Sequence, residues 1–126
     1  MKKLNNILAL ITFLYAFMVY ILTMAPTTSF WDCGEFIATA ITLGVPHPPG
    51  TPFYLLLGNV FSQLPSFSDL GARVNLMSPI FSALAVMFLY LIIVQLIEQW
   101  KGKIKSWPDC LIVYGSAIIG AFTFAV

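Results

Sequence analysis

The sequence predicts an all-α membrane protein, and three observations lead to that prediction. Of its 126 residues, 60% are hydrophobic and only 9% are charged, whereas a soluble domain carries about a quarter charged residues. Long apolar stretches without any charge recur along the chain, and most basic residues lie at the ends of these stretches. The same composition excludes a disordered chain, and a net charge of +1 provides no electrostatic footprint for nucleic acid.

The first transmembrane helix is expected at about residues 7–25. The chain carries no charge from Leu4 to Trp31, and about 20 apolar residues are enough to cross a hydrocarbon core. A cleaved signal peptide is the alternative, because two lysines precede the apolar run. We favour the transmembrane helix, since the run is long and Met24-Ala25-Pro26 is a poor cleavage site.

Residues 26–73 form a long and unusually apolar connection, in which two short helices are expected. The first is predicted at 33–43. Asp32 is a good N-cap, and Glu35 three residues later resembles the second half of a capping box. Gly44 is a natural residue to end this helix, because glycine adopts the left-handed conformation at little cost.

The second short helix of this connection is predicted at 52–64. Thr51 can cap it, Pro52 suits its first position, and Pro65 ends it. A helix of about 13 residues is too short to span a bilayer, so it suits an interfacial or re-entrant segment.

A second charge-free stretch predicts a transmembrane helix at 74–97, and Ser68 or Asp69 starts the run into it. Pro79 lies within its first two turns, where a kink is tolerated. A third apolar stretch, the 16 residues from Leu111 to Val126, predicts the start of another transmembrane helix at 109–126. Because this stretch is shorter than a usual span, we interpret the sequence as the N-terminal piece of a longer multi-pass protein.

The basic residues predict the orientation of these helices. Five of the six fall on one side: Lys2, Lys3, Lys101, Lys103 and Lys105. By the positive-inside rule, the N-terminus and the turn at 98–108 should be cytoplasmic, and the connection at 26–73 should face the outside. That side is the periplasm of a bacterium, or a lumen in a eukaryotic cell.

Asp32 and Glu35 are the first candidates for chemistry, because no other two acids lie so close together in the chain. Three residues apart at a helix start, they share one face beside aromatic neighbours. A carboxylate against an apolar surface can act as a base. The alternative is plain capping, since negative charge is stabilised at a helix N-terminus.

His47 and Arg73 are the remaining candidates, both for substrate binding. His47 can hydrogen-bond a substrate or simply the backbone. It is the only histidine, so a metal site would need Asp32 or Glu35 as further ligands, and we do not expect a divalent metal or another cofactor. Arg73 can meet an anionic lipid phosphate, or instead anchor the chain at the interface or pair with Asp69.

Two motifs in the outer connection carry a family resemblance. They are Trp31-Asp32-Cys33-Gly34-Glu35-Phe36 and His47-Pro48-Pro49-Gly50, followed by Arg73-Val74-Asn75-Leu76-Met77-Ser78 at the start of the second span. Together they resemble a bacterial family of large multi-pass membrane proteins of unassigned function. That family is common in the Bacteroidetes and is similar to transmembrane protein O-mannosyltransferases, with a fold like that of the GT-C glycosyltransferases.

The resemblance implies an enzyme in the bacterial inner membrane that takes a sugar from a polyprenyl-phosphate carrier. Its acceptor would be a hydroxyl group, such as a protein Ser or Thr, on the outer face. Asp32 would be the catalytic base, Glu35 would assist or orient it, and Arg73 would contact the carrier phosphate. Residues 1–126 alone would lack the later helices of such a site and should be inactive.

Two other functions remain open for this sequence. One is a transporter, although transporters place ionisable groups near the middle of their spans and no predicted span here contains one there. The other is a non-catalytic subunit of a membrane assembly.

Overall fold

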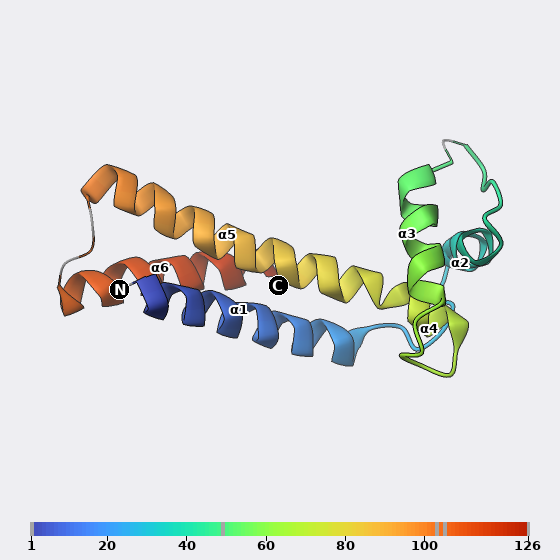
Figure 1. Ribbon diagram of the computed structural model, residues 1–126, viewed down its shortest axis with the longest axis horizontal. Coiled ribbons are helices and arrows are strands. Elements are labelled where there is room, and N and C mark those ends of the chain that lie inside the picture. The colour runs from blue at the N-terminus through green and yellow to red at the C-terminus, as the bar shows by residue number, and fades with distance from the viewer. Residues whose placement is uncertain (1, 49, 103, 105, 126) are drawn as a thin grey trace. The chain divides into compact units, whose positions relative to one another are not determined.

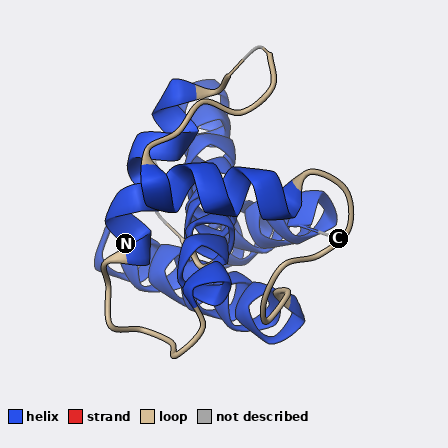
Figure 2. Cartoon of the chain, turned by 90° about the vertical axis from the view of Figure 1, so that its right-hand side faces the viewer, coloured by secondary structure: helices blue, strands red, loops and turns tan. Residues whose placement is uncertain are grey.

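The computed structural model describes residues 2–48, 50–102, 104 and 106–125 (Figure 1). Within these residues every regular element is a helix and no strand occurs (Figure 2). The helices are α1 (Lys2–Thr23), α2 (Cys33–Thr42), α3 (Pro52–Ser62), α4 (Leu70–Asn75), α5 (Met77–Lys101) and α6 (Trp107–Ala125). The all-α prediction is therefore confirmed. The chain divides into two compact units, Met1–Tyr20 with Phe81–Val126, and Ile21–Ile80.

Among the residues that the structure describes, three helical segments are long and apolar enough to cross a membrane. They are α1, the run of α4 and α5 over Leu70–Lys101, and α6. The last has 19 residues, because Ser106 extends it beyond the apolar run. The Ser106 hydroxyl accepts from the Asp109 backbone N–H and donates to its carboxylate, which completes the first turn.

A break separates α4 from α5 at Leu76. Proline lacks a backbone N–H and its ring crowds the carbonyl four residues earlier. Pro79 therefore leaves the carbonyl of Asn75 without its helical partner, and α4 ends at that residue. Ser68 or Asp69 was expected to start this run, and the N-cap of α4 is Asp69, whose carboxylate accepts from the Ala72 N–H at 2.9 Å.

The first unit has a core formed by α1, α5 and α6. Its buried residues include several alanines, among them Ala9 and Ala16 of α1 and Ala117 and Ala121 of α6. Small residues let helix backbones approach closely, which is how helices associate in a membrane. Tyr90 of α5 is fully buried, and its hydroxyl donates to the Asn5 side chain at 3.0 Å.

The second unit holds α2, α3 and α4, with α3 packed against both of the others. The two helices approach closely at Gly58 of α3, where an added Cβ would lie 2.9 Å from the Ala40 Cβ of α2. The next residue, Asn59, donates its side-chain amide to the carbonyls of Ala40 and Ile41. Thus α3 supplies partners for two carbonyls at the C-terminal end of α2.

A second set of hydrogen bonds in this unit holds the segment that follows α1. The Asn75 amide donates to the backbone carbonyls of Ala25 and Thr27, at 3.1 and 2.9 Å. The Thr27 hydroxyl also donates to the Asp69 carboxylate at 3.3 Å. Residues about fifty positions apart in the sequence are therefore joined by side chains of α4 and its cap.

The end of α2 differs from the prediction. Leu43, not Gly44, adopts the left-handed conformation, with φ of 52°. The Gly44 N–H donates to the Thr39 carbonyl at 2.9 Å. In this capping motif the left-handed residue is the one just before the residue whose N–H donates. Because Gly44 donates, Leu43 is left-handed, although glycine adopts that conformation at less cost.

Candidate functional site

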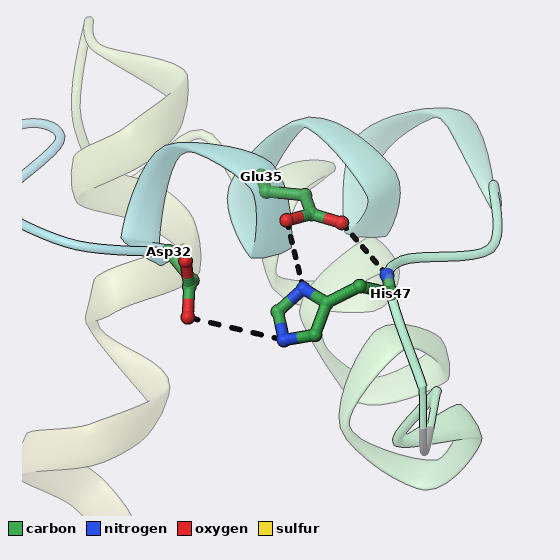
Figure 3. A group of neighbouring side chains, drawn as sticks. All are labelled: Asp32, Glu35 and His47. Carbon is green, nitrogen blue, oxygen red and sulfur yellow. Dashed lines mark hydrogen bonds and ion pairs between the residues drawn. The ribbon is translucent and has the colours of Figure 1, made fainter.

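The structure brings Asp32, Glu35 and His47 together on the surface of the second unit (Figure 3). Asp32 and Glu35 lie at the N-terminal end of α2, and His47 lies in the connection after α2. The His47 Nδ1 atom is 2.9 Å from Glu35 Oε2, and its backbone N–H donates to Glu35 Oε1 at 2.8 Å. The other ring nitrogen, Nε2, is 3.9 Å from Asp32 Oδ2.

The predicted capping box does not form. The Asp32 side chain makes no capping hydrogen bond, and the Glu35 carboxylate binds His47 instead of the backbone at the helix start. Both acids therefore direct their carboxylates towards the histidine (Figure 3). Because the Asp32 side chain caps no backbone N–H, its carboxylate is available for chemistry. The capping interpretation had assigned that carboxylate to the helix start.

The arrangement shifts the pKa values of two of these groups. Hydrogen bonds from the backbone and then the side chain of His47 lower the pKa of Glu35. The hydrogen bond and the negative charge of Glu35 raise the pKa of His47, and Asp32 adds a smaller effect. Because all three side chains are exposed, solvent screens these interactions strongly.

Local sequence explains why His47 is held in this place. Prolines precede and follow it, and proline restricts both its own φ and the conformation of the residue before it. Pro46 is buried. The His47 ring lies 5.7 Å from the Phe36 ring, and Phe36 in turn contacts Tyr54 edge-on at 5.8 Å.

An apolar cavity of about 280 Å³ lies in the same unit, lined by Cys33, Phe36, Thr51 and Tyr54. Two of its residues directly follow the candidate acids in the sequence. Partial burial raises the pKa of Tyr54, so its hydroxyl remains protonated. Thr51 was expected only to cap α3, and Tyr54 was not expected at a site. The signal that could have identified Tyr54 is a hydroxyl-bearing ring in a mostly apolar helix.

Thr51 is strained at this cavity. Its φ is 40°, in the left-handed region, and its side chain makes no capping hydrogen bond to α3. The first position of α3 is Pro52, as predicted. Because a β-branched residue rarely adopts a positive φ, this is the kind of local strain that clusters at functional sites.

Arg73 takes no part in the cluster of Asp32, Glu35 and His47. Its Nε donates to the Phe67 carbonyl at 2.6 Å, and an Nη donates to the Ser62 carbonyl at 3.3 Å. The guanidinium therefore binds the turn that joins α3 to α4. Its predicted pairing with Asp69 is not among the ion pairs of the described residues.

Comparison with known proteins identifies the family. Residues 32–126 match the N-terminal domain of the protein O-mannosyl-transferase TMEM260. A protein O-mannosyl-transferase tmem260 of Dictyostelium discoideum is 29% identical over 110 residues, which cover 85% of this chain and 13% of that protein. The TMEM260 protein of Mus musculus is 35% identical over 88 residues, which cover 70% of this chain and 12% of the relative.

The chain spans about an eighth of the length of these relatives. No solved structure matches it at a significant level. Because the family match covers three quarters of the sequence and begins at Asp32 itself, the chain belongs to the TMEM260 N-terminal domain family.

Proposed function

We propose that this chain is the N-terminal part of a membrane glycosyltransferase that transfers a sugar to a hydroxyl of a protein acceptor. Membership of a family named for protein O-mannosyl transfer supports this proposal, as do three helices of spanning length. We further propose that the donor sugar is linked to a polyprenyl phosphate and that the fold is of the GT-C type. The cavity beside the candidate acids supports an apolar carrier.

The single observation that carries the chemistry is the position of the Asp32 carboxylate. It is exposed, makes no capping bond, and lies at the N-terminal end of a helix. In the proposed reaction, Asp32 accepts the proton of the acceptor hydroxyl as the hydroxyl oxygen bonds to the anomeric carbon. The bond between that carbon and the carrier phosphate breaks, and the phosphate leaves with the electron pair.

Glu35, His47 and Arg73 have supporting roles in this proposal. Glu35 fixes His47 through one hydrogen bond to the ring and one from the backbone N–H, so that Nε2 faces both Asp32 and an arriving substrate. Arg73 uses two of its donors on the turn before α4. Its remaining N–H groups are those that would meet the carrier phosphate.

We also propose an orientation with the N-terminus in the cytoplasm and residues 26–73 outside. The distribution of lysines supports it, although Lys103 and Lys105 lie outside the described residues. In the inner membrane of a bacterium the site would face the periplasm. In a eukaryotic cell such as those of the two relatives, it would face a lumen.

The substitution Asp32→Asn tests the proposed base, in the full-length protein and with a polyprenyl-linked sugar donor. Asparagine keeps the shape of the side chain but cannot accept a proton. Transfer should therefore fall about a hundredfold or more, the usual scale for a positioned base. Thermal stability should change little, because Asp32 makes no capping bond.

Asp69→Asn is the matched control. It makes the same chemical change at the N-cap of α4, where Asp69 bonds the Ala72 N–H and asparagine caps about equally well. This variant should retain transfer. Normal transfer by a folded Asp32→Asn protein would refute the assignment of Asp32 as base.

A further inference from the structure

The contacts of His47 determine which of its ring nitrogens carries the proton. Glu35 is a carboxylate and can only accept hydrogen bonds when ionised, so the His47 Nδ1 atom at 2.9 Å must be the donor. In the neutral ring the proton is then on Nδ1, and the lone pair of Nε2 points towards Asp32. This tautomer is the one that binds metal ions through Nε2.

The gap between Nε2 and Asp32 Oδ2 is close to the size of a metal bridge. At 3.9 Å the two atoms are too far apart for a hydrogen bond. An ion about 2.1 Å from each of two ligands holds them about 3.4 Å apart at a tetrahedral angle and about 4.2 Å apart on opposite sides, so a shift of about 0.5 Å brings these atoms to tetrahedral spacing. Donor atoms of Asp32, Glu35 and His47 all lie within 4.8 Å of one another.

We propose that Asp32 and His47 bind a divalent cation such as Mn²⁺ or Zn²⁺, with Glu35 as the residue that positions the imidazole. An imidazole with carboxylates suits Mn²⁺ and Zn²⁺ better than Ca²⁺, which prefers an all-oxygen shell. Histidine ligands commonly donate their second ring N–H to a carboxylate, and this partner fixes the ring and raises its basicity. Glu35 makes that bond here and also accepts the His47 backbone N–H.

Two protein ligands leave most positions around the ion open. Water fills them at rest, and a phosphate oxygen of a substrate can replace the water, as at other sites built from few protein ligands. Asp32 keeps its second carboxylate oxygen for an acceptor proton. This last role rests on the proposed transferase function, whereas cation binding itself does not.

The test measures Mn²⁺ binding to the full-length protein in lipid nanodiscs, without any sugar donor. Electron paramagnetic resonance of free Mn²⁺ gives the number of bound ions. Pulsed measurements of electron spin echo modulation then report whether a nitrogen atom is bound directly to Mn²⁺. We expect a nitrogen signal in the wild-type protein that is absent from His47→Gln, and one fewer bound Mn²⁺ in both His47→Gln and Asp32→Asn.

Glu35→Gln separates a positioning residue from a ligand. It should keep the nitrogen signal and weaken Mn²⁺ binding by about tenfold, the lower end of the range for such partners. Glu98→Gln, an acid on α5 outside the cluster, should bind Mn²⁺ like the wild type. A wild-type protein without the nitrogen signal, or a signal that persists in His47→Gln, would overturn the proposal whether or not the enzyme transfers sugar.

Discussion

Replacing Gly58 with alanine should separate α2 from α3, because the added Cβ would lie 2.9 Å from the Ala40 Cβ and 3.4 Å from a methyl of Val74. Ordinary contacts between such atoms begin at about 3.4 Å, so α2 must move by roughly 0.5 Å. Overpacking costs about 1 to 3 kcal/mol, while alanine gains about 1 kcal/mol over glycine in a helix. We expect a net loss of about 1 kcal/mol.

A double-mutant cycle with Ala40→Gly isolates the contact. Ala40→Gly alone should destabilise α2 by about 1 kcal/mol, from the helix preference of alanine. In that background the opposing Cβ is gone, so Gly58→Ala should become neutral or stabilising. The coupling between the two sites should therefore be about 1 to 2 kcal/mol and favourable.

Native-state hydrogen exchange of the peptides that cover α2 and α3 measures these free energies locally. Gly115→Ala on α6 is the matched control, since no atom lies within 4 Å of its added Cβ, and it should leave exchange in α2 and α3 unchanged. Effects of Gly58→Ala and Ala40→Gly that add within about 0.5 kcal/mol would show that the close approach of the two helices is not what the structure describes.

Three other predictions concern the same unit and the orientation of the chain. The Glu35 and His47 pair should stabilise the protein most between about pH 4.5 and 6.5. Its contribution is lost as pH falls through the lowered pKa of Glu35 and as pH rises through the raised pKa of His47. A difference in melting temperature between wild type and Glu35→Gln that keeps growing up to pH 9 would contradict this. Asn59→Asp removes the amide donor to two carbonyls of α2, so it should destabilise α2 by about 1 to 3 kcal/mol in thermal unfolding. Asn59→Gln keeps an amide but moves it by one methylene, so it should destabilise α2 by at least as much. In a cysteine-free background, a membrane-impermeant thiol reagent should label Ser66→Cys from outside and leave Gln99→Cys unlabelled; the opposite pattern would invert the topology.

The helices could be predicted from the sequence because their signals are local. Charge-free runs and the prolines at 52 and 79 set the starts and breaks of α3 and α5. The observed ends of the two short helices lie within two residues of the predictions at 33–43 and 52–64. The residue that ends α2 was wrong by one position, since the capping motif depends on which N–H reaches the Thr39 carbonyl.

The candidate site was only partly predictable. Asp32, Glu35 and His47 were each identified by residue type. Their spacing of up to 15 positions does not predict that the chain after α2 turns back and places His47 beside the start of that helix. Capping rules favoured local bonds for the acids, and the competing long-range bonds to His47 prevailed. Arg73 was placed by charge alone, whereas its geometry is set by the carbonyls of the preceding turn.

The bonds from Asn75 to Ala25 and Thr27 constrain the order in which the chain can assemble during synthesis. Contacts between α2 and α3 join residues about 20 positions apart and can form as soon as α3 has left the ribosome. The segment after α1 must wait for α4, since closing a loop of about fifty residues gains nothing until Asn75 arrives. In a chain whose synthesis pauses before Asn75, α2 and α3 should therefore already be paired, while the segment after α1 is not yet bonded to α4. Once synthesis resumes, the bonds from Asn75 should form in one step.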